Sequence, residues 1–202
     1  MDERAACRKA TAERSTLLSL AAILTHDLSN PLQSITVLCE LGIEGDEPGE
    51  GPRRAQQSLS AAERMRDLLH AYAALVRNTD RPTKLSTAVE RTAAMFARRR
   101  ERHRISLKVG VERDFEGPAT TGLAIVALFM ALIETAEGGT GPFEACLVLE
   151  GPKATASLVD SAGAPVAWSQ SATQRIADIL FEDGAVEVED GRLEIQLEPQ
   201  RS

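Results

Sequence analysis

The sequence predicts an α+β protein in which an N-terminal helical hairpin is followed by a small α/β sandwich. Apolar residues recur at three- and four-residue steps over the first 80 residues, which is the period of amphipathic helices. Beyond Pro82, segments with the alternating pattern of strands are interspersed with segments that have helical periodicity. This order predicts helices packed on one face of a mixed sheet. We therefore expect two units, residues 1–79 and residues 83–202.

The first helix of the hairpin has a single apolar face. At about 100° per residue, its apolar side chains point within roughly 60° of one direction. Pro31 lies in the same row. The residues on this face are Leu17, Leu20, Leu24, Leu28, Ile35 and Leu38.

A turn and a second helix complete the hairpin. The segment 44–52 contains three glycines and two prolines and predicts a turn. The helix after it has an apolar side formed by Leu59, Ala62, Met65 and Leu69. Two helices alone leave apolar surface uncovered, so we expect two copies to pair as a homodimer with a four-helix bundle.

The second unit follows a linker at residues 78–82. Its helices alternate with strands, and the pair Asp190-Gly191 is a turn signal between the last two strands. The expected helices span residues 86–102, 122–136 and 172–181, and the expected strands span residues 105–111, 144–150, 154–159, 185–189 and 192–197.

Composition and charge exclude several classes of function. The chain of 202 residues has a formal net charge of −7 and a pI near 5.1, whereas nucleic acids and anionic membranes bind cationic surfaces. We expect no nucleic-acid or membrane partner, and we interpret the arginines at 98–104 as a solvated helix end. The cysteines, Cys7, Cys39 and Cys146, are odd in number and far apart, so they predict neither a disulfide framework nor a zinc site. This pattern favours a reduced cytoplasmic compartment. No run of about 18 apolar residues predicts a transmembrane span.

His26 lies on the side of the first helix opposite the apolar face, about 180° away on the helical wheel. This position excludes a core histidine of the hairpin. Around it the helix carries small, uncharged or apolar residues where a solvated face ordinarily carries Lys and Glu. We interpret this face as a docking surface for another protein, with Ile23, Gln33 and Val37 among its contacts.

The residues that follow His26 suit phosphoryl transfer. Asp27 can accept the proton of one imidazole nitrogen, which makes the other nitrogen a better nucleophile. Asn30, one turn later, can orient a water molecule or a phosphoryl oxygen. Pro31 lacks a backbone N–H and is expected to kink the helix just past the histidine.

Residues 26–32, His-Asp-Leu-Ser-Asn-Pro-Leu, resemble the phosphoacceptor box of two-component sensor histidine kinases. That box is His, an acidic residue, two variable positions, Asn or Thr, and Pro-Leu. The resemblance implies that His26 is phosphorylated, that Asp27 is its acidic neighbour and that Asn30 takes part in dephosphorylation. It also implies the layout of those kinases, a dimerisation hairpin followed by an α/β ATP-binding domain.

The second unit departs from the kinase pattern where those kinases bind ATP. Thr135 stands where the family has the Asn that holds Mg²⁺, and we expect its neighbour Glu134 to be structural rather than a metal ligand. The loop at Asp160 keeps the family's aspartate but has Ala162 and Ala164 in place of glycines, and the added Cβ atoms crowd it. After this loop the chain reaches the next expected helix too soon to include the mobile lid of the kinases.

The sequence thus looks like a histidine phosphotransferase of the dimeric, kinase-like type, with a degenerate ATP-binding domain. The resemblance implies that His26 exchanges phosphate with the aspartates of response-regulator receiver domains in a phosphorelay, without using ATP. No cofactor is expected on this chain, because the receiver supplies Mg²⁺. Catalysis then consists mainly of positioning and charge neutralisation.

Two other functions remain open at this point. A sensor histidine kinase with a divergent ATP site would bind ATP analogues. A non-catalytic dimeric adaptor or kinase regulator with a vestigial histidine would keep its partner binding and activity after His26 is replaced. Metal binding by His26, His70 and His103 is not expected, because they lie on separate segments without ligand spacing.

Overall fold

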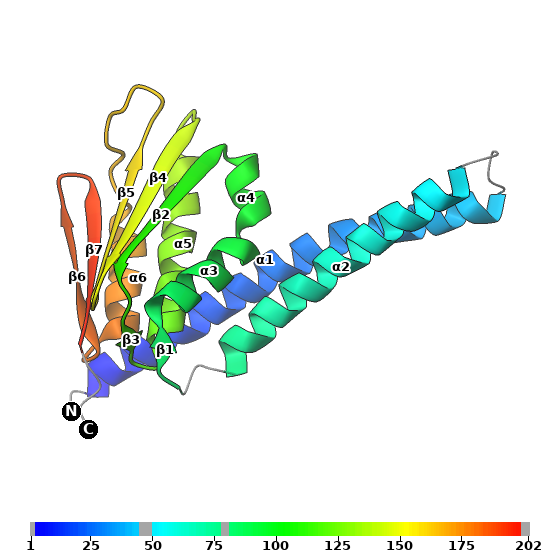
Figure 1. Ribbon diagram of the computed structural model, residues 1–202. Helices are drawn as coiled ribbons and strands as arrows, with labels where there is room; N and C mark the ends of the chain where they lie inside the picture. The colour runs from blue at the N-terminus through cyan, green and yellow to red at the C-terminus, as the bar shows by residue number, and fades with distance from the viewer. Residues whose placement is uncertain (1–2, 45–49, 78–80, 199–202) are drawn as a thin grey trace. The chain divides into compact units, whose positions relative to one another are not determined.

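The computed structural model describes residues 3–44, 50–77 and 81–198. The architecture is α+β, a long helical hairpin followed by a five-stranded mixed sheet, as the sequence predicts (Figure 1). Contacts divide the chain into two compact units, Leu17–Ala74 and Met1–Thr16 with Leu75–Ser202. The first turns of the first helix therefore belong to the same unit as the sheet. Within the described ranges no helix is both long and apolar enough to cross a membrane.

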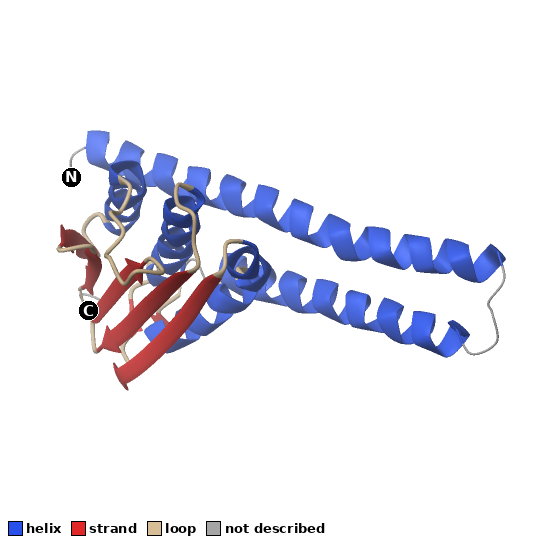
Figure 2. Cartoon of the chain, turned by 90° about the horizontal axis from the view of Figure 1, so that it is seen from above, coloured by secondary structure: helices blue, strands red, loops and turns tan. Residues whose placement is uncertain are grey.

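The hairpin consists of α1 (Glu3–Glu44) and α2 (Glu50–Arg77), which run side by side in opposite directions (Figures 1 and 2). The turn predicted for residues 44–52 was wrong at both ends, because Glu44 still belongs to α1 and α2 already includes Gly51 and Pro52. Proline is tolerated in the first turn of a helix, where its missing N–H has no intrahelical partner. Residues 45–49 of the predicted turn lie outside the described residues.

The predicted apolar face of α1 is confirmed. Leu20, Leu24 and Pro31 are buried, and α1 continues as one helix through the proline. The remaining members of the row are half-buried: Leu17, Leu28, Ile35 and Leu38.

The inner face of α2 differs from the prediction. Ala61 is buried and Met65 half-buried, whereas Leu59, Ala62 and Leu69 are exposed. The helix has two adjacent apolar stripes, and the hairpin covers the stripe that contains Ala61. On α1 the side chains of Leu18 and Leu32 are also exposed, at 62% and 54%. A single hairpin therefore leaves apolar residues of both helices uncovered.

The sheet of the second unit has the strand order β2-β4-β5-β7-β6. The pair β2–β4 is parallel and the other three pairs are antiparallel, so the predicted mixed sheet is confirmed. Asp190 and Gly191, with φ values of 49° and 73°, form the turn of the last hairpin, as their residue types predict. The strands are β2 (Ile105–Arg113), β4 (Phe143–Glu150), β5 (Lys153–Val159), β6 (Gly184–Glu189) and β7 (Arg192–Leu197).

Three helices cover one face of this sheet: α3 (Leu85–Met95), α5 (Thr121–Glu137) and α6 (Gln170–Leu180) (Figure 2). Helix α5 contacts both of its neighbours and is buried all round, which explains its almost wholly apolar sequence. The strands contribute alternate residues to the same core, as a sheet with one solvated face requires. Its members include Ala145, Leu147, Leu149, Ala154, Leu158, Leu193 and Ile195.

The helix predicted for residues 86–102 is broken in two. Helix α3 ends before Phe96, and α4 (Ala97–Arg102) begins after it. Phe96 is fully buried, with its ring centroid 5.9 Å from that of Phe129, so the break coincides with a core contact. Two short strands, β1 (Thr83–Lys84) and β3 (Glu116–Gly117), were not predicted and pair only with each other.

The arginines of α4 are less solvated than the sequence predicts. Arg98, Arg99 and Arg100 are half-buried, and Nη2 of Arg100 donates to the carbonyl of Ala93 at 3.3 Å. Burial lowers the pKa of Arg100 and outweighs the opposing effect of Glu101. Only the end of the cluster, Arg102 and Arg104, is exposed as expected.

The first turns of α1 are held to the sheet unit by polar contacts. Nζ of Lys9 lies 3.1 Å from Oδ2 of Asp183, and the hydroxyl of Thr120 donates to the same oxygen at 3.0 Å. Asp183 follows α6, so one carboxylate links α1, the start of α5 and the end of α6.

Candidate functional site

His26 projects outward from the middle of α1. Its side chain is 49% exposed, whereas the side chain of the next residue, Asp27, is only 7% exposed. Successive residues of a helix differ by about 100° in direction, so one neighbour faces solvent and the other faces inward. The predicted exposure of His26 is confirmed, and Asp27 is a buried carboxylate within the apolar face.

The two side chains contact each other. Nδ1 of His26 lies 3.0 Å from Oδ1 of Asp27. An ionised carboxylate only accepts hydrogen bonds, so a neutral His26 that donates to it carries its proton on Nδ1 and a lone pair on Nε2. The same contact fixes the orientation of the ring. An imidazole held in this way has the chemistry that a nucleophile needs, with Nε2 as its unprotonated nitrogen.

The polar residues after His26 are oriented in different ways. The hydroxyl of Ser29 donates a hydrogen bond to the carbonyl of Thr25 at 2.7 Å, so its proton is used within the helix. Asn30 is exposed one turn after His26, and Pro31 is buried. Asn30 therefore remains available to a molecule approaching the histidine.

A groove between the two helices begins one turn from His26. It has a volume of about 650 Å³ and lies wholly within the hairpin unit. Three predicted site residues, Asn30, Gln33 and Val37, line it. The structure thus brings these three together, whereas Ile23 is half-buried and lies outside the groove. The other lining residues are Ser34, Leu38, Gln57 and Arg64.

Gln57 and Arg64 were not found from the sequence. They are seven residues apart on α2, two helical turns, and so share one face. This spacing was a usable signal, but the pairing of α2 against α1 decides which face meets the groove. That pairing cannot be read from either helix alone.

Glu134, which the sequence places beside the position of the family's metal-holding residue, forms an ion pair. Nη1 of Arg175, on α6, lies 2.8 Å from Oε1 of Glu134, on α5. Glu134 therefore joins two helices, in agreement with a structural role. Among the described residues no group of three His, Cys, Asp or Glu side chains is arranged to hold a metal ion.

The loop that keeps the family's aspartate is closed on itself. Oδ1 of Asp160 accepts the backbone N–H groups of Ala162 and Ala164, each at 2.9 Å, and the N–H of Asp160 donates to the carbonyl of Ala164. Gly163 completes the turn with a φ of 78°. Oδ1 of Asp160 thus accepts two amides of its own loop and holds the turn in shape.

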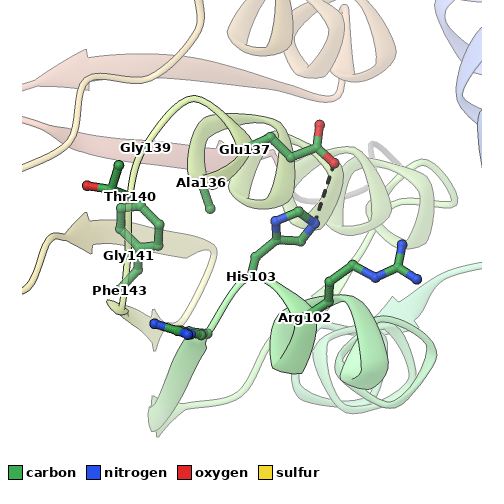
Figure 3. A pocket seen from close by; sticks show the side chains of 9 residues that line it. Arg102, His103, Ala136, Glu137, Gly139, Thr140, Gly141 and Phe143 are labelled. Carbon is green, nitrogen blue, oxygen red and sulfur yellow. Dashed lines mark ion pairs between the residues drawn. The ribbon is translucent and has the colours of Figure 1, made fainter.

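A second, smaller pocket lies at the end of α5 and has a volume of about 240 Å³. His103 projects toward Glu137 in it, with Nε2 of the histidine 3.5 Å from Oε1 of the carboxylate (Figure 3). Arg102 lies nearby, but its guanidinium is directed away from the histidine (Figure 3). The positive groups do not converge on one point, so we assign no ligand to this pocket.

Solved structures with a similar fold are known, although sequence comparisons find no relative. No protein-family model and no curated protein matches the chain. A bacterial phosphotransferase structure matches 90% of this chain and 95% of its own, with a TM-score of 0.50 and 14% identity.

Two histidine kinase structures are also similar to the chain. The Acinetobacter baumannii histidine kinase AdeS matches 85% of this chain and 96% of its own, with a TM-score of 0.43 and 12% identity. The histidine kinase ThkA, in complex with the response regulator protein TrrA, matches 98% of this chain and 66% of its own, with a TM-score of 0.38 and 14% identity. At such identities a comparison concerns the fold alone, and the fold of this chain is similar to that of the bacterial phosphotransferase.

Proposed function

We propose that the protein is a histidine phosphotransferase of a two-component phosphorelay, which carries phosphate on His26 between receiver-domain aspartates. One observation carries the proposal: an exposed imidazole on a helix is oriented through Nδ1 by a buried carboxylate, at 3.0 Å. An ordinary surface histidine has no such fixed partner. The sequence of residues 26–32 supports the same assignment.

The chemical step follows from this geometry. The lone pair of Nε2 attacks the phosphorus of a receiver's aspartyl phosphate in line with the P–O bond, which breaks as the N–P bond forms. The receiver carboxylate leaves with the bonding electrons. The proton on Nδ1 stays on the ring, and Asp27 stabilises the positive charge that develops there. The reverse step passes the phosphate to a second receiver.

The docking surface for the receiver is proposed to be the exposed face that continues from His26 into the groove. Gln33 and Asn30 offer amides there, and Val37 offers an apolar contact at 51% exposure. The receiver is expected to bring its own Mg²⁺, because no described residue of this face is a carboxylate arranged for a metal. Ile23 is expected at the edge of this contact.

Contacts in the sheet unit are consistent with a phosphotransferase that does not use ATP. Asp160 is bound to its own loop, and Glu134 is bound to Arg175, so both acidic groups near the family's nucleotide positions are occupied. These contacts give each group a structural role, which supports the proposal that the sheet unit does not supply phosphate. We therefore expect phosphate to reach His26 from other proteins.

A homodimer is proposed to complete the hairpin. Four leucines of the hairpin are exposed, and exposed large apolar side chains mark surfaces that bind other proteins: Leu18 and Leu32 on α1, and Leu59 and Leu69 on α2. Pairing of two hairpins into a four-helix bundle buries such surfaces.

The test is a labelling experiment with two possible phosphate sources. The purified protein is incubated with a panel of phosphorylated receivers, and separately with labelled ATP and Mg²⁺. We expect acid-labile label on the wild type from at least one receiver, none from ATP, and none on His26→Gln. Label from ATP alone would identify a kinase, and the absence of label from every receiver would support an adaptor.

A further inference from the structure

The α2 wall of the groove carries a charge whose role the sequence did not suggest. We infer that Arg64 is a specificity-determining residue that recognises a carboxylate at the rim of the receiver's phosphorylation site. This inference rests on the proposed function, since it names the group on the receiver that the groove selects. Arg64 acts in binding and takes no part in the transfer step.

Two other arginines of α2 are paired with carboxylates. Arg54 pairs with Glu50, and Arg66 pairs with Asp67 at 3.1 Å. Among the residues that the structure describes, no acidic group pairs with Arg64, although its side chain is exposed and lines the groove. Its guanidinium is therefore available to an external anion.

The rest of the groove is uncharged. Asn30, Gln33 and Gln57 contribute amides, and Val37 and Leu38 contribute apolar surface. The hydroxyl of Ser34, which also lines the groove, donates to the carbonyl of Asn30 at 3.1 Å. Arg64 thus supplies the sole formal charge of this lining, in a chain whose net charge is −7.

Charge complementarity identifies the kind of partner. A single cation in a neutral groove of an acidic protein attracts an acidic group and repels a basic one. The planar guanidinium also favours carboxylates through paired N–H donors, which a lysine ammonium does not reproduce. The receiver must place its acidic phosphorylation site next to His26, and the groove begins one turn away. A receiver carboxylate beside that site is the group that Arg64 fits.

The experiment compares Arg64→Glu and Arg64→Lys with a matched control, Arg66→Glu. The control has the same change of charge, two residues away on α2, and points roughly 160° away from Arg64. For each variant the single-turnover rate from a phosphorylated receiver to His26 is measured at several salt concentrations. Labelling of His26 by phosphoramidate, which needs no docking, is measured in parallel, with thermal melting and light scattering as checks of folding and assembly.

We expect Arg64→Glu to slow receiver-dependent transfer at least about tenfold, because it sets two like charges against each other. Arg64→Lys should fall between it and the wild type, and labelling by phosphoramidate should stay unchanged in both. A receiver variant with one rim carboxylate replaced by Lys should restore transfer to Arg64→Glu. Added salt should slow transfer in the wild type and speed it in Arg64→Glu, because salt screens an attraction in the first and a repulsion in the second.

Two results overturn the inference while leaving the proposed function intact. One is a wild-type transfer rate in Arg64→Glu, and the other is an equal loss in Arg66→Glu. If no receiver labels wild-type His26, the proposed function fails and the inference fails with it.

Discussion

Nδ1 of His26 lies 3.0 Å from Oδ1 of Asp27, although one side chain faces solvent and the other faces the interior of the hairpin. Neighbouring positions on one helix bring the two side chains together. The imidazole is thereby held by a carboxylate that is itself buried.

Asp27→Asn is expected to slow phosphate transfer to His26 at least about tenfold. The amide has nearly the same shape as the carboxylate, but it carries no charge to stabilise the phosphorylated ring and can present an N–H to Nδ1 instead. Single-turnover transfer from a phosphorylated receiver measures the effect. Wild-type transfer in a folded Asp27→Asn protein would mean that the contact only orients the ring.

Leu24→Asp and Leu69→Asp separate folding of the hairpin from pairing of two hairpins. Leu24 is 5% exposed, so an aspartate there is buried without a partner and should cost at least about 3 kcal/mol of unfolding free energy. Leu69 is 47% exposed, so its replacement should leave the helical circular dichroism intact but yield a monomer in light scattering. A dimeric Leu69→Asp would show that the dimer uses another surface.

Val37→Glu is expected to reduce transfer from the receiver at least about tenfold, because it sets a negative charge against the acidic site of the receiver. Val37 is 51% exposed, so melting temperature should change little. Asn30→Ala should instead slow hydrolysis of phosphorylated His26 more than transfer, since the amide is expected to orient water. Equal effects of both substitutions on both rates would contradict this division of roles.

Asp160→Ala tests whether the sheet unit takes part in phosphate supply. The substitution removes two hydrogen bonds to backbone amides and should cost about 1 kcal/mol of stability. Transfer from a receiver should remain at the wild-type rate, because no nucleotide is involved. A large loss of phosphorylation with little loss of stability would instead support a residual nucleotide site.

Glu13→Gln should raise the melting temperature at pH 7. Burial raises the pKa of Glu13, Lys9 opposes this shift and Asp183 adds to it. A raised pKa in the folded state means that stability is highest below the ordinary value of 4.5 and is lost as pH rises through the folded value. The advantage of the glutamine should disappear when melting is repeated near pH 4. A lower melting temperature at pH 7 would show that the attraction to Lys9 dominates.

Much of this structure could be predicted because local sequence and packing agree. The row from Leu17 to Leu38 has one period and one buried side, and the Asp190-Gly191 pair favours the left-handed backbone of its turn. His26 was identified by the same periodicity, since its position opposite the row requires exposure. The contact of Asp27 with the imidazole could be predicted because the two residues are adjacent in the sequence.

What could not be predicted depends on contacts between distant segments. Helix α2 has two apolar stripes, and only the packing of the hairpin decides that Ala61 is inside and Leu59 outside. The break at Phe96 accompanies its ring contact with Phe129, which is remote in sequence. The sequence alone does not distinguish Arg64 from a solvated surface arginine. Only the packing of α2 against α1 shows that it lines a groove with Asn30 and Val37.

The central claim is that Asp27 holds Nδ1 so that Nε2 of His26 takes the phosphate. Its most direct test is ³¹P and ¹⁵N NMR of the protein labelled by a phosphorylated receiver. We predict a single phosphohistidine at residue 26, with phosphorus bonded to Nε2 and a proton retained on Nδ1. Phosphorus on Nδ1, on another residue, or on no residue of the wild-type protein would contradict the account.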